Sequence, residues 1–150
     1  MNWFPVLLAV HIGLAVAMLL PSVVLPFVLR RADGASGPAT QALMAMQGGG
    51  TLLIAAALAA TGVAMLWILG PDLLSRPWLI TALVLYAINL AVAALVSRPN
   101  LRRMVGIGSG DPESDALWRR RARRQRWVAY GMAGAIGVIG LLMSTKPQLW

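Results

Sequence analysis

Apolar residues fill four long runs of this chain, and charged residues fall between the runs or at their ends. A helix crosses the hydrocarbon core of a bilayer with about 20 mostly apolar residues. We therefore predict an all-α bundle of four transmembrane helices, forming a single integral membrane domain over residues 1–150. The predicted spans cover residues 4–29, 42–69, 78–96 and 127–143.

Turn and capping residues predict how these spans are connected. Only the short segment 70–76 joins the second and third spans, so we expect the two to be antiparallel neighbours. Asp111 followed by Pro112 is typical of a helix start, with a side-chain cap and a proline at the first position. No helix breaker follows before Gly131, so we expect one helix to start near Pro112 and to run on as the fourth span. The basic cytoplasmic loop predicted at 97–126 thus continues into the fourth helix.

The distribution of basic residues predicts the orientation. Eleven arginines follow the first and third spans, nine of them from Arg98 to Arg126, whereas Arg76 and Lys146 lie at the opposite side. The positive-inside rule then puts both termini outside and the basic loop in the cytoplasm. The first span has basic residues after it and none before it, which favours a retained span over a signal peptide. Tryptophans are expected at the outer interface (Trp3, Trp67, Trp78, Trp150) and at the inner one (Trp118, Trp127).

The composition argues against several classes of protein. Hydrophobic residues make up 59% of the chain and charged residues 12%, which is too apolar for a soluble surface of this size. The chain has no cysteine, which excludes disulfides, thiolate metal sites and iron–sulfur clusters. The net charge is +8, but no stacking platform or recognition motif accompanies the arginines, so we do not expect nucleic-acid binding.

All five acidic residues fall outside the predicted spans. Ion-coupled transporters usually carry a carboxylate at membrane depth, where it binds the proton or cation. A pair of carboxylates for acid–base catalysis is absent from the spans as well. We therefore expect neither an enzyme nor an ion-coupled transporter, and a small channel or transporter lined by threonine and asparagine stays a third alternative.

The single histidine, His11, lies within the first span. At 1.5 Å per residue it falls about 10 Å below the outer end, and Thr61 and Tyr86 of the next two spans fall at about the same depth. The three side chains therefore predict an intramembrane polar patch. A second polar layer is expected in the inner half. Alternatively, the side chains of both layers only form hydrogen bonds between the helices and have no further function. This inner layer comprises Ser22, Gln47, Thr51 and Asn89.

His11 is also the candidate cofactor ligand. Haem takes histidine with methionine as axial ligands, and copper(I) takes soft thioethers. Met18 lies on the same helical face as His11 but two turns away, about 10 Å, so a second ligand would come from Met65 or another subunit. One histidine without a carboxylate or thiolate is a poor metal site. No cofactor or metal is therefore expected, with haem as the alternative.

Small residues and arginines are the candidate contact residues of the fourth helix. Glycines at regular spacing let helix backbones approach closely, either within the bundle or against a partner subunit. These are Gly131, Gly134, Gly137 and Gly140. Arginines beside an anionic leaflet bind lipid head groups, and an acidic protein is the alternative partner. These are Arg119, Arg120, Arg121, Arg123, Arg124 and Arg126.

Several short motifs occur in a familiar order. The early His11 is followed by Thr61-Gly62, Pro77-Trp78-Leu79, Arg98-Pro99 and Lys146-Pro147. This order resembles a family of uncharacterised four-helix bacterial membrane proteins, distantly related to the copper-resistance protein D group. The resemblance implies a multi-pass protein of the bacterial inner membrane with no assigned reaction. The copper-resistance group would imply metal handling through histidines and methionines, and this chain has only His11.

Together these observations favour a non-enzymatic function. The leading hypothesis is an accessory or stabilising subunit of a larger membrane complex, which contacts other membrane proteins and anionic lipids. The alternative is a haem- or copper-handling protein that uses His11.

Overall fold

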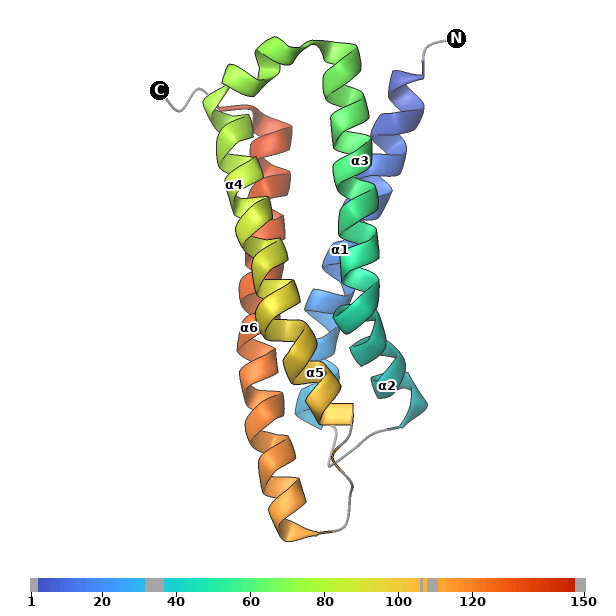
Figure 1. Cartoon of the computed structure of the whole chain (residues 1–150), viewed down its shortest axis with the longest axis vertical. Coiled ribbons are helices and arrows are strands. Elements are labelled where there is room, and N and C mark those ends of the chain that lie inside the picture. The colour runs from blue at the N-terminus through green and yellow to red at the C-terminus, as the bar shows by residue number, and fades with distance from the viewer. Residues whose placement is uncertain (1–2, 32–36, 106, 108–110, 148–150) are drawn as a thin grey trace.

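The computed structural model describes residues 3–31, 37–105, 107 and 111–147, and these residues form helices without a β-strand. Four helices are long and apolar enough to cross a membrane, which confirms the predicted class of a multi-pass helical membrane protein. They run up and down in turn, so that the start of the first and the end of the fourth lie at the same end (Figure 1). The four are Phe4–Arg31, Pro38–Leu69, Pro77–Val105 and Pro112–Thr145.

Two of these helices contain a wider π-helical turn. The first helix is α1 (Phe4–Arg31), and the fourth is α6 (Pro112–Thr145). The second consists of α2 (Pro38–Ala45), the π turn η1 (Met46–Gly50) and α3 (Thr51–Leu69). A 3-10 turn, η2 (Pro71–Ser75), leads to the third, which consists of α4 (Pro77–Val92), the π turn η3 (Ala93–Ser97) and α5 (Arg98–Val105).

The third helix does not end where the sequence suggested. We expected it to stop at residue 96, before Pro99, yet it continues to Val105. A proline ring inside an α-helix clashes with the carbonyl four residues earlier, and the wider turn of η3 directly before Pro99 relieves this crowding. Within the predicted basic segment 97–126, residues 97–105 are helical and not a loop, whereas 112–126 are helical as expected from the helix predicted to start near Pro112.

The helices pack as two pairs that are joined most closely at one end. α3 packs on α1, α4 packs on α6, and α1 also packs on α6. In the upper half of Figure 1 the backbones of α1 and α3 stand apart from those of α4 and α6, and side chains connect the two pairs, because Leu66 of α3 packs against a cluster that contains Trp78 and Leu79 of α4. Elsewhere the second and third helices touch directly, since η3 contacts η1 and α3, and α5 contacts η1 and α2. The prediction that the second and third spans are antiparallel neighbours is therefore confirmed, with their closest contact at η1 and η3 and not between α3 and α4.

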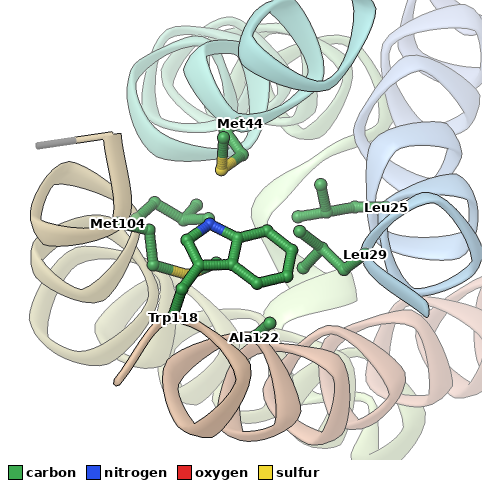
Figure 2. Close-up of a cluster of buried hydrophobic side chains, with 7 residues drawn as sticks. Leu25, Leu29, Met44, Met104, Trp118 and Ala122 are labelled. Carbon is green, nitrogen blue, oxygen red and sulfur yellow. The ribbon is translucent and has the colours of Figure 1, made fainter. Parts of the chain in front are cut away.

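Trp118 lies at the centre of a hydrophobic core at the arginine-rich end of the bundle. Its indole is 2% exposed and is surrounded by side chains from α1, α2, α5 and α6 (Figure 2). Trp118 and the buried Trp78 are therefore not interface tryptophans, as the sequence had suggested, whereas Trp67 and Trp127 are exposed. The cluster around Trp118 comprises Leu25, Leu29, Met44, Leu101, Met104 and Ala122.

α6 begins as its sequence predicts. A carboxylate oxygen of Asp111 accepts a hydrogen bond from the backbone N–H of Ser114 at 3.2 Å, and Pro112 occupies the first helical position. From this cap the helix runs for 34 residues without a break, so the arginine-rich segment and the fourth span form one element. The predicted cap and the predicted continuous helix are both confirmed.

Candidate functional site

A hydrogen bond between α1 and α3 anchors the histidine. His11 Nδ1 lies 2.8 Å from Thr61 Oγ1, and the Thr61 hydroxyl donates to the carbonyl of Leu58 at 2.9 Å. A hydroxyl has one proton, so a Thr61 that donates to Leu58 can only accept from His11. From these contacts we infer the tautomer with the ring proton on Nδ1, which leaves a lone pair on Nε2.

A cavity of about 220 Å³ lies beside this histidine, and we call it the His11 cavity. Sixteen residues from α1, α3, η2, α4 and α6 line it, and twelve of them are Ala, Val, Leu, Ile or Met. His11 and Tyr86 supply polar groups, and Trp78 adds an indole. The cavity lies between α3 and α4, where the backbones of the two helices stand apart.

The predicted polar patch is partly assembled. His11 and Tyr86 line the same cavity, whereas Thr61 lies behind His11 and contacts its ring. Tyr86 donates its hydroxyl to the carbonyl of Ala55 on α3 at 2.6 Å, which ties α4 to α3 across the gap. The phenol oxygen keeps a lone pair, so both polar side chains present acceptors.

Gly62 lies against the imidazole. A Cβ atom added at Gly62 would lie 3.4 Å from His11 Cε1, at the short limit of ordinary van der Waals contact. The residue next to Thr61 therefore contacts the ring as well. This contact was not predictable from the sequence, because it depends on which helix faces His11.

Haem and copper fit this cavity poorly. A cavity of about 150 Å³ holds one benzene, so a cavity of about 220 Å³ does not enclose four pyrrole rings. Met65 and Met143 do line the cavity with His11, whereas Met18 is buried and does not. A copper ion there would find imidazole and thioethers but no carboxylate or thiolate to neutralise it in an apolar site. The lining thus favours a neutral ligand.

The inner polar layer is buried. Gln47 donates its amide to Ser22 Oγ at 3.2 Å and approaches Met132 Sδ at 3.8 Å. Thr51 Oγ1 donates to the Met46 carbonyl at 3.3 Å. The amide oxygen of Gln47 and the amide nitrogen of Asn89 are buried without a partner among the described residues. The layer therefore connects α1, η1 and α6, and Asn89 takes no part in its hydrogen bonds.

A third polar cluster was missed by the sequence analysis. Gln125 is fully buried, donates to Ser97 Oγ at 2.7 Å and accepts from the Asn100 amide at 3.0 Å. Ser97 and Asn100 fell in the expected loop, and Gln125 fell among the arginines. A signal was nevertheless present, because the buried residues of α6 recur at spacings of four and three. This buried stripe is Trp118, Ala122, Gln125, Ala129 and Met132.

The six arginines of α6 lie on the helix faces beside the first half of this buried stripe. Four are exposed, and Arg121 and Arg126 are half-buried. Within the described part of the chain none of the six forms an ion pair with a carboxylate. The Nε atoms of Arg98 and Arg121 are buried without a partner. The arginine-rich end therefore carries cations that no carboxylate of the described residues neutralises.

The glycines of α6 are open to the outside. All four are exposed, and a methyl group added at any of them would meet nothing within 4 Å. The bundle therefore does not use them for close helix contacts, against the interpretation that they pack within it. Gly131 and Gly134 belong to an exposed stripe with spacings of four and three, which we call the outward stripe. It consists of Trp127, Gly131, Gly134, Val138 and Leu141.

Comparison with known proteins adds no relative: no family model, curated protein or solved structure matches the chain. The resemblance to four-helix bacterial membrane proteins stays a prediction.

Proposed function

We propose that the chain is a non-enzymatic accessory subunit of a larger complex in a bacterial inner membrane. The outward stripe of α6 is its contact with a helix of another subunit. The arginine-rich end lies in the cytoplasm and binds anionic head groups.

The observation that carries this proposal is the exposure of the outward stripe. Spacings of four and three give a seam along one helix face, the pattern with which helices pack in bundles. Small residues in such a seam let two backbones approach, and helices in lipid associate by this packing because apolar burial gives no advantage there. Gly131 and Gly134 supply the small residues, flanked by Trp127, Val138 and Leu141.

The unpaired arginines support the second part of the proposal. Each arginine near an anionic leaflet contributes about 1 kcal/mol of binding. A bidentate guanidinium also suits the oxygens of a phosphate head group. Anionic lipid would neutralise cations that have no carboxylate partner among the described residues.

The test is purification from native membranes in a mild detergent, followed by native mass measurement of the wild type and two variants. Gly134→Leu puts a large side chain into the outward stripe. Ala87→Leu puts the same side chain on an exposed position of α4 and is the matched control. We expect a partner chain in fixed ratio that is lost from Gly134→Leu and kept by Ala87→Leu.

Two results would contradict the proposal. A wild-type chain that purifies alone would exclude a stable subunit, and a partner lost equally from both variants would exclude the outward stripe as its contact. A partner that proves to be a second copy of this chain would replace the accessory role by self-association.

A further inference from the structure

The His11 cavity has a chemistry that the accessory role does not use. We propose that it binds the phenolic ring of a small apolar molecule or of a ring-bearing lipid, with the ring hydroxyl donated to His11 Nε2. This inference does not rest on the proposed function, because the cavity and the outward stripe are formed by different residues.

The hydrogen bonds of the lining residues favour a ligand that donates a hydrogen bond. Thr61 holds the proton of His11 on Nδ1, so Nε2 accepts. Tyr86 has given its proton to Ala55, so its oxygen also accepts. A carbonyl or ether, which only accepts, would leave Nε2 unpaired, and an unpaired polar group in an apolar site is costly. A hydroxyl donates to Nε2 and can in turn accept from the indole of Trp78, which lines the same cavity.

The volume and the apolar lining of the cavity suit a ligand with a single ring. A cavity of about 150 Å³ lined by hydrocarbon holds benzene, so about 220 Å³ holds a ring with short substituents. Twelve of the sixteen lining residues are purely hydrocarbon or thioether side chains. They suit an uncharged ring, and a carboxylate or ammonium group would be unpaired there. A bulky amphiphile can still be accommodated with its tail outside, because the cavity is partly open.

The experiment uses two ligands of equal shape. 4-Propylphenol carries the hydroxyl, and 4-propyltoluene carries a methyl group in its place. Binding of each to the full chain in detergent is measured by calorimetry for the wild type and for His11→Phe. We expect His11→Phe to weaken the phenol about tenfold, the loss of about one hydrogen bond to a buried acceptor, and to leave the toluene unchanged.

A second variant tests the proton assignment without removing the imidazole. Thr61→Val takes away the acceptor that keeps the proton on Nδ1, so Nε2 becomes a donor in part of the molecules and phenol binding weakens. The matched control is Thr81→Val on α4, which removes a similar hydroxyl bonded to the Pro77 carbonyl, outside the cavity lining. We expect Thr81→Val to bind both ligands as the wild type does.

The proposal is overturned if the wild type does not bind the phenol. It is also overturned if His11→Phe weakens both ligands equally, which would indicate a purely apolar cavity. Equal effects of Thr61→Val and Thr81→Val would remove the assigned role of Nε2. If the ring is that of a lipid, 3-pentadecylphenol will bind with the same dependence on His11; if only short phenols bind, the natural ligand is a free small molecule.

Discussion

Buried amide side chains connect the helices at the arginine-rich end. Gln125 joins α6 to η3 and α5 through Ser97 and Asn100. The Asn100 amide also reaches the carbonyl of Arg121 at 3.3 Å. Hydrogen bonds among fully buried groups have a defined geometry, and leaving one partner unsatisfied costs more than the bond itself contributes. This cluster therefore specifies the register of α5 against α6.

We predict that Gln125→Leu lowers the free energy of unfolding by about 1–3 kcal/mol, because the Ser97 hydroxyl and the Asn100 amide lose their partner. Gln41→Leu, the same change at an exposed position of α2, should leave stability within about 0.5 kcal/mol. The measurement is reversible unfolding in mixed detergent micelles. A Gln125→Leu protein as stable as Gln41→Leu would contradict the inferred role of the cluster.

α6 is the element that joins the two ends of the molecule. Its buried stripe packs into the bundle, its outward stripe faces away, and its arginines lie beside the buried stripe. The helix starts outside the apolar region, so its first turn depends on the Asp111 cap and not on burial. Local chemistry therefore determines where this helix begins.

Asp111→Ala should destabilise the start of α6 by about 0.5–2 kcal/mol, because the Ser114 N–H loses its acceptor. Asp111→Asn retains an oxygen that can accept this bond and should cost little. Hydrogen exchange of the first turn of α6 is the measurement. Equal protection in Asp111→Ala and Asp111→Asn would show that the cap does not hold the helix start.

At the scale of the whole molecule, the charge distribution predicts the orientation. The ends of the first and third helices and the first half of α6 lie together at the lower end of Figure 1, and they carry eleven arginines. Arg76 and Lys146 lie at the other end. From the positive-inside rule we therefore predict that the arginine-rich end lies in the cytoplasm.

Because the chain has no cysteine, a single introduced thiol reports the side of the membrane without background. Ala116→Cys lies in the exposed first turns of α6, and Ser75→Cys lies in η2 at the opposite end. We expect a membrane-impermeant maleimide to label Ser75→Cys in intact cells and Ala116→Cys only after the membrane is opened. The reverse labelling would invert the orientation, and labelling of both in intact cells would disprove the topology.

Features that depend on neighbours along the chain or on the bilayer could be predicted from the sequence. A long apolar run must be helical in lipid because its backbone has no other hydrogen-bond partner. The four spanning helices and the Asp111 cap were therefore predictable. The C-terminal end of the third helix was predicted too early. Pro99 usually ends a regular α-helix, but here the π turn η3 precedes it and the helix continues to Val105.

The contacts between helices could not be predicted from the sequence, because they depend on three-dimensional packing. Side chains in lipid gain nothing from burial as such, so a run of leucines does not show which face packs inward. For this reason Trp118 at the core, Gln125 in its cluster and the gap between α3 and α4 could not be read from their positions. The depth of His11 and Thr61 was readable from the helical rise, but their hydrogen bond and the cavity beside it come from the packing of α1 on α3.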